Sequence, residues 1–281
     1  MTRIDAHHHV WDLGVRDQPW TEALPPLRRS FLYAELAPSL TRHAIDGTVV
    51  VQTVCVPEET PELLALAHET PTIAGVVGWV DLEAPDVTDR LAALRSGPGG
   101  QRLVGIRHQV QEEPDPEWLA RPAVLAGLAA VAAADFAYDL VVRSDQLPMV
   151  FDAVRAIPEL RFVLDHGGKP PIASGALEPW RTNLRAISSC PNVSVKLSGL
   201  GTEADPPSLD PRTLQPYVET LLEAFGPGRT MFGSDWPVCL LAGSYDETIE
   251  TATQFTDQLS PAEAADVFGE TAKRVYRLEV A

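Results

Sequence analysis

The chain has 281 residues, of which 45% are apolar, and this is enough to form a full hydrophobic core in one large domain. Its formal net charge of -17 argues against nucleic acid or an anionic membrane surface as partner, because both require a basic face. The sequence has no apolar run of membrane-spanning length, no secretion-signal pattern and three widely spaced cysteines, so we expect a cytoplasmic protein with reduced thiols.

Eight short runs of apolar and β-branched residues predict buried β-strands. They are Arg3–His9, Thr48–Val54, Ile73–Leu82, Leu103–Val110, Tyr138–Arg143, Arg161–His166, Val193–Leu197 and Thr230–Gly233. Segments with helical spacing lie between them, at Pro61–Glu69, Val87–Arg95, Ala123–Ala134, Gln146–Ala156, Arg181–Ser188 and Leu214–Phe225. Alternating strands and helices favour a parallel sheet, and eight such units favour a closed barrel. We therefore predict an α/β fold, a (β/α)8 TIM barrel that forms a single domain over residues 1–281.

Two segments lack this periodicity and are predicted to be long loops. Asp12–Leu40 is rich in Pro, Trp and Arg and should carry one short helix, and Thr202–Arg212 follows the seventh strand. Both should lie at the C-terminal face of the barrel, where active sites of this fold are built.

Polar residues gather at the C-terminal ends of the predicted strands, which is typical of a functional site in a barrel. They include His7–His9, Arg107 and His108, Arg143, Asp165–Lys169, Lys196 and Ser198, and Asp235. Because side chains alternate along a strand, Asp5, His7 and His9 should share the inner face while His8 points away. His166 and Asp235 are weak signals alone, but with His7 and His9 they form a candidate site. The chain has only three lysines, Lys169, Lys196 and Lys273, a hint that arginine does not serve at these positions.

The motifs IDAHHHVW, GIRH, DHGGKP, VKLSGL and GSDWP occur in this order between Arg3 and Tyr276. In this respect the chain resembles the amidohydrolase superfamily, and more closely the amidohydrolase-related branch with L-fuconolactonases, L-rhamnonolactonases and 2-pyrone-4,6-dicarboxylate lactonases. The resemblance implies hydrolysis of a small cyclic ester, with His7, His9, His166 and Asp235 as the site. A binuclear metal centre is not expected, because the strand-four and strand-five ends offer Arg107, His108 and Arg143 instead of the required lysine and histidine. The cofactor is then one divalent ion, with zinc favoured, or none.

The expected mechanism is attack of water on a lactone carbonyl. Asp235 would act as the base, and Arg107, Lys169 and the histidines would stabilise the developing charge. A sugar lactone needs aromatic faces and hydrogen-bond donors, whereas a dicarboxylate lactone needs several arginines. The candidate substrate-binding residues are Lys169, Gln52, Trp79, Arg143, Trp20, Trp236 and His108, and their balance favours a sugar lactone.

Two other interpretations stay open at this point. One is a metal-dependent decarboxylase or hydratase of the same superfamily, and the other is a binding protein that has kept the barrel but lost catalysis. The sequence predicts a small-molecule substrate and leaves the oligomeric state open.

Overall fold

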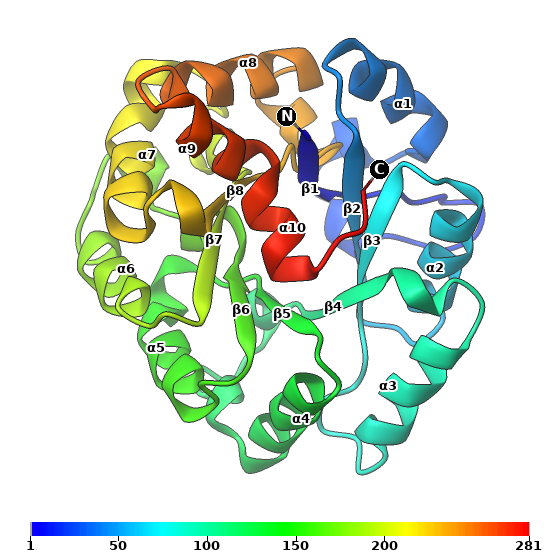
Figure 1. The fold of residues 1–281 in the computed structure, drawn as a ribbon. Helices are drawn as coiled ribbons and strands as arrows, with labels where there is room; N and C mark the ends of the chain where they lie inside the picture. Colours follow the sequence, from blue (N-terminus) through cyan, green and yellow to red (C-terminus); the bar gives the residue numbers. More distant parts are fainter. Residues whose placement is uncertain (1, 281) are drawn as a thin grey trace.

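The computed structural model describes residues 2–280, and its eight parallel strands lie side by side in sequence order. They are β1 (Ile4–His8), β2 (Gly47–Val51), β3 (Ile73–Gly78), β4 (Leu103–His108), β5 (Ala137–Leu140), β6 (Arg161–Leu164), β7 (Val193–Leu197) and β8 (Thr230–Phe232). The strands curve into a ring with helices outside it (Figure 1). The predicted (β/α)8 barrel is therefore confirmed, with several strands one to four residues shorter than expected.

The first and last strands meet at the C-terminal end of the barrel. The backbone N–H of Asp235 donates to the His7 carbonyl at 2.8 Å, and the N–H of His9 donates to the Trp236 carbonyl at 2.7 Å. His8 and Trp236 form a parallel bridge. The segment after β8 thus completes the ring beside the three histidines of β1.

Ten α-helices are present in the described part of the chain. They are α1 (Tyr33–Arg42), α2 (Glu59–Glu69), α3 (Val87–Ser96), α4 (Pro122–Ala133), α5 (Leu147–Ala156), α6 (Trp180–Ser188), α7 (Pro211–Phe225), α8 (Tyr245–Thr256), α9 (Pro261–Ala265) and α10 (Thr271–Tyr276). The six predicted helices correspond to α2–α7, and α1 is the short helix expected in the first loop. The sequence prediction missed α8–α10, although Ser244 and Ser260 each form a capping box with a glutamate three residues later.

The interior of the barrel has an apolar floor beneath its polar upper part. Ile4, Val49, Val77 and other inward-facing strand residues pack against Ala272 and Val275 of α10. In Figure 1, α10 (red) lies across the centre of the ring and covers this end. Among residues 2–280, no helix combines the length and the apolar character that crossing a membrane requires.

The packing of α4 against the barrel predicts a destabilising effect for Gly127→Ala. A Cβ at this position would lie 2.3 Å from the backbone oxygen of Leu82, which cannot move away as a flexible side chain can. The clash should cost about 1–3 kcal/mol and outweigh the gain of about 1 kcal/mol in helix propensity.

Thermal unfolding of the two proteins checks this expectation. Gly228→Ala is the matched control, because a Cβ there has 3.9 Å to its nearest neighbour, and its Tm should equal that of the wild type. A Gly127→Ala protein with an unchanged or higher Tm would contradict the packing seen between α4 and Leu82.

Candidate active site

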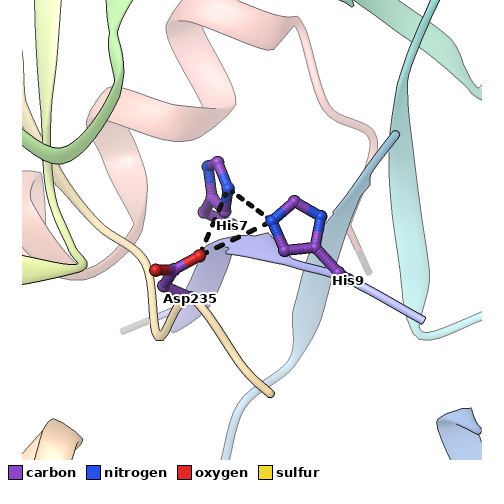
Figure 2. Close-up of side chains that lie close together, drawn as sticks. All are labelled: His7, His9 and Asp235. Carbon is purple, nitrogen blue, oxygen red and sulfur yellow. Dashed lines mark hydrogen bonds and ion pairs between the residues drawn. The ribbon is translucent and has the colours of Figure 1, made fainter. Parts of the chain in front are cut away.

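Four side chains from three strand ends converge at the C-terminal face of the barrel. His7 Nε2 lies 3.1 Å from His9 Nε2 and 3.7 Å from Asp235 Oδ1, and His9 Nε2 lies 3.5 Å from the same oxygen. Figure 2 shows these three side chains pointing toward one another. His166 Nε2 lies 4.0 Å from Asp235 Oδ1. The structure therefore brings together His7, His9, His166 and Asp235, as the sequence predicts.

The local backbone of β1 corrects one part of the prediction. The register between β1 and β2 shifts between Asp5 and His8. As a result, Asp5 does not join the histidines: its carboxylate accepts from the backbone N–H groups of His7 and Ser234 and from the Tyr245 hydroxyl. His8 does point away from the site, and its Nε2 lies 3.0 Å from the hydroxyl of Thr48.

The backbone that carries His166 and Asp235 is in the left-handed region. The φ angles are +53° at His166, +49° at Lys169 and +57° at Asp235. This conformation costs a non-glycine residue about 1–2 kcal/mol, and such strain clusters at functional sites. Gly199 allows the arrangement, because its own φ is +63° and a Cβ there would lie 2.6 Å from His166 Nδ1. The fold thus tolerates strain in order to aim these two side chains into the site.

Hydrogen bonds orient two of the histidine rings. His9 Nδ1 lies 2.8 Å from the Val51 carbonyl, which can only accept, so this nitrogen carries the proton and Nε2 keeps a lone pair facing the site. His166 Nδ1 lies 2.9 Å from the Ser198 hydroxyl. Burial lowers the pKa of His166 to about 4, so its ring is neutral near neutral pH.

Asp235 is an ionised and incompletely bonded carboxylate. Burial alone raises its pKa, but His166, His9 and Lys169 outweigh burial and hold the pKa of Asp235 below its usual value. Its Oδ1 is buried and has no hydrogen-bond partner, although it lies 3.5–4.0 Å from a nitrogen of each of the three histidines. A buried acceptor of this kind calls for a ligand, because leaving it unsatisfied is costly.

The donor set has the chemistry and the spacing of a mononuclear zinc site. Nitrogen and oxygen donors at about 2.0–2.2 Å from a tetrahedral ion lie about 3.3–3.6 Å apart. The separations of 3.1–3.7 Å among His7, His9 and Asp235 are close to this spacing. His166 Nε2 lies further out, at 4.0 Å from Asp235 Oδ1. His7 with Asp165 and His166 is a second group whose donor atoms lie within 4.8 Å of one another. These residues fit a divalent ion.

Beneath the histidines lies a buried ionic cluster of Arg107, Asp139, Asp165 and Lys196. Lys196 Nζ lies 2.6 Å from Asp139 and 3.0 Å from Asp165, and Arg107 Nη1 donates to Asp165 Oδ2 at 3.0 Å. The two cations balance the two carboxylates, which removal from water requires. Burial alone raises the pKa of Asp165, but Lys196, His7 and Arg107 outweigh burial and hold this pKa well below its usual value. The sequence analysis named Lys196 among the polar strand-end residues and as a rare lysine, but it did not identify Asp139.

A cavity of about 340 Å³ opens above the site and is large enough for a small ligand. Of the predicted residues, His9, His166, Asp235, Arg107, Lys169 and Trp20 line it. The remaining polar wall was not predicted and consists of Thr53, Gln109, Gln111, Glu112, Thr202 and Glu203. Two of these, Thr202 and Glu203, lie in the predicted second loop, and the run from Gln109 to Glu112 follows β4. In the sequence, the signal that could have identified the residues between Gln109 and Glu112 was a polar run directly after a strand.

The other predicted substrate-binding residues lie outside this wall. Trp79 donates to His108 Nδ1 at 3.0 Å, and His108 stacks on Trp118. Trp236 is buried and packs edge-on against Phe31. The sequence predicted that these three side chains bind substrate, but in the structure they pack into the protein beside the cavity and do not line it.

Gln52 and Arg143 do not line the cavity, but each lies next to a residue that does. Gln52 is fully buried and its Oε1 accepts from Arg107 Nη2 at 3.1 Å, so it holds the arginine in place. Arg143 lies at an adjoining hollow that also includes Lys169 and Glu203, and its guanidinium pairs with Asp145 at 3.1 Å.

Comparison with known proteins identifies the family. The family model described as Amidohydrolase matches residues 4–278. The L-fucono-1,5-lactonases of Burkholderia ambifaria and Burkholderia multivorans are 39% and 41% identical to the chain, covering 99% and 98% of it and 96% of each relative. A solved amidohydrolase structure from Burkholderia multivorans with bound zinc is 40% identical, with a TM-score of 0.94, over 99% of this chain and 100% of that one. The chain belongs to the amidohydrolase family.

Proposed function

We propose that this protein is a lactonase that opens a sugar lactone, with one zinc ion held by His7, His9, His166 and Asp235. The observation that carries the proposal is the convergence of these donors below a polar cavity, in a chain that is 39% and 41% identical to two L-fucono-1,5-lactonases. The substrate is a small molecule, and the enzyme acts in the cytoplasm as a single-domain barrel.

Asp235 is the proposed base. Its ionised carboxylate lies at the floor of the cavity, where it orients a water molecule and accepts its proton as the water attacks the lactone carbonyl. The bond between the carbonyl carbon and the ring oxygen breaks, and the leaving alkoxide oxygen takes up that proton to become a hydroxyl. A bound zinc ion would supply a water of lowered pKa and polarise the carbonyl.

Charge that develops on the carbonyl oxygen needs donors in the cavity wall. Arg107 lines the wall and is held by Asp165 and Gln52, while its buried Nε has no partner. Lys169 lies 3.5 Å from Glu203 and also faces the cavity. Both cations are therefore proposed to stabilise this oxygen or to bind hydroxyl groups of the substrate.

The charges of the cavity wall favour a sugar lactone over a dicarboxylate lactone. Arg107 and Lys169 face three carboxylates, those of Glu112, Glu203 and Asp235. Such a wall suits a neutral ring with several hydroxyl groups, and it repels a second carboxylate. The additional arginines that a dicarboxylate needs are engaged elsewhere: Arg16 with Glu62, Arg28 with Asp17, and Arg29 with Glu35.

A panel of lactones measured together with metal content tests the proposal. The purified protein should contain about one zinc ion per chain and should hydrolyse aldonolactones in preference to 2-pyrone-4,6-dicarboxylate. Chelation should lower turnover, and added zinc should restore it, because zinc-bound water ionises near neutral pH.

Three results would count against it. Full activity without metal would remove zinc from the reaction but keep the lactonase. Failure on every lactone, together with tightly bound zinc and decarboxylation of an unsaturated acid, would favour the decarboxylase interpretation. Tight lactone binding without turnover would indicate a binding protein.

Replacing the proposed base gives a sharper test. Asp235→Asn should lower kcat by about 10²–10⁴-fold, the usual contribution of a general base, while the circular dichroism spectrum stays unchanged. The matched control is Asp152→Asn on the exposed surface of α5, which should keep wild-type turnover. Turnover of Asp235→Asn near that of the control would exclude Asp235 as the base.

The opposite orientations of two neighbouring histidines make a second mutational prediction. His7→Ala should lose activity on the scale of Asp235→Asn, because its Nε2 belongs to the donor set. His8→Ala should retain turnover within about tenfold, since its ring bonds Thr48 outside the site and its loss removes one hydrogen bond. Steady-state kinetics of both variants decides, and equal losses would contradict the assigned orientation of His8.

A further inference from the structure

Among the three histidines, only His7 has its second ring nitrogen next to a cation. Lys196 Nζ lies 2.9 Å from His7 Nδ1, whereas His9 Nδ1 faces the Val51 carbonyl and His166 Nδ1 faces the Ser198 hydroxyl. Metal-bound histidines normally donate this second N–H to a carboxylate, a carbonyl or water. His9 and His166 meet that requirement as they stand, but His7 does not, because an ammonium group can only donate.

The shortest contacts of His7 define where its proton lies. Lys196 donates to Nδ1, so Nδ1 carries the lone pair and the proton of the neutral ring is on Nε2. Nε2 then donates to His9 Nε2 at 3.1 Å, whose lone pair faces it because His9 Nδ1 donates to Val51. Arg107 Nη1 also approaches His7 Nε2, but at 3.4 Å, and it has Asp165 Oδ2 as the better acceptor at 3.0 Å.

An alternative acceptor for the proton of His7 lies beside the ring. Asp165 Oδ1 is fully buried and lies 3.4 Å from His7 Nδ1. It forms an ion pair with Lys196 Nζ at 3.0 Å but accepts no hydrogen bond of good geometry. Among residues 2–280, Asp235 Oδ1 is the other buried carboxylate oxygen that accepts no hydrogen bond. With a metal at the donor set, the metal would satisfy Asp235 Oδ1, and an Nδ1 proton on His7 would satisfy Asp165 Oδ1. Each of these two oxygens would thus gain a partner in one second state of the site.

We propose that Lys196 is a positioning residue that holds His7 with its proton on Nε2 and thereby weakens metal binding. Metal binding then requires the proton to leave Nε2 and a proton to arrive at Nδ1, where Asp165 accepts the hydrogen bond in place of the contact with Lys196. The ring stays neutral and the number of protons is unchanged. Lys196 keeps Asp139 and Asp165 as partners in both states. This inference rests on the metal site of the proposed function and adds the device that sets its affinity.

The full-length wild-type protein gives a direct test without any variant. Two-bond ¹H–¹⁵N correlation NMR on ¹⁵N-histidine-labelled protein distinguishes the two neutral tautomers, and His7→Gln assigns the His7 signals. After chelation, His7 should show the proton on Nε2, and one equivalent of zinc should move it to Nδ1. A proton on Nδ1 before zinc is added, or no change on adding zinc, would overturn the proposal.

Zinc affinity, measured by competition with a chromophoric chelator, tests the role of Lys196 itself. Lys196→Met combined with Asp139→Asn removes one cation and one carboxylate, so the cluster stays balanced. This variant should bind zinc about tenfold more tightly or better, which is the scale of one charge-assisted hydrogen bond, and its His7 should carry the proton on Nδ1 without metal.

Tyr276→Phe is the matched control, because the Tyr276 hydroxyl bonds Asp139 at 2.7 Å within the same cluster and has no hydrogen bond to His7. Its zinc affinity and His7 signals should equal those of the wild type. Equal affinity of the double variant and the wild type would overturn the role of Lys196. Should the double variant not fold, the wild-type NMR comparison decides alone. Lactone hydrolysis is assayed separately: hydrolysis without a tautomer change refutes this inference only, and a tautomer change without hydrolysis refutes the proposed function only.

Discussion

The candidate active site depends on the balance of charge in the buried cluster beneath it. Arg107, Lys196, Asp139 and Asp165 lie almost entirely out of water, and each carboxylate has a cation within 3.0 Å. Breaking one such buried pair typically costs about 3–5 kcal/mol, because an uncompensated charge is left behind. The cluster joins β4, β5 and β7 to the segment after β6. It contacts His7 and holds Arg107 at the cavity wall. The apolar floor below it, covered by α10, keeps water out from the other side.

The upper part of the site is shaped by strain in the backbone. His166, Lys169 and Asp235 all have positive φ, and the hydrogen bonds of the barrel rim compensate for the cost. The imidazole of His166 is also held by Ser198, and Gly199 leaves room for it. A rigid rim of this kind fixes the donor atoms, while the cavity wall of amide, hydroxyl and carboxylate groups provides contacts suited to a hydroxylated ring.

The sequence allowed the fold and the central donors to be predicted, because both depend on local patterns. Strand runs, helical spacing and the polar strand ends placed His7, His9, His166 and Asp235 on one rim. The buried cluster could not be predicted, since Asp139 and Lys196 lie inside strands and only the closed ring makes them neighbours. The register shift in β1 likewise depends on its pairing with β2, so Asp5 was assigned to the wrong face. Trp79, His108 and Trp236 were expected at the cavity because they lie near strand ends. A strand end fixes the level of a residue along the barrel axis, but it does not fix the direction in which the side chain points.

The closure of the ring has a consequence for how the protein matures. His7 and His9 lie at the start of the chain and Asp235 near its end, and the backbone bonds that join them also seal β1 to β8. The donor set is therefore assembled only when nearly the whole barrel has formed. Favourable contacts must offset the entropy cost of bringing together the two ends of the chain between His9 and Asp235. A ligand that contacts all of these side chains at once therefore favours the closed ring over a partly folded chain. Binding of such a ligand would stabilise the closed barrel, so the active site would also contribute to the stability of the fold.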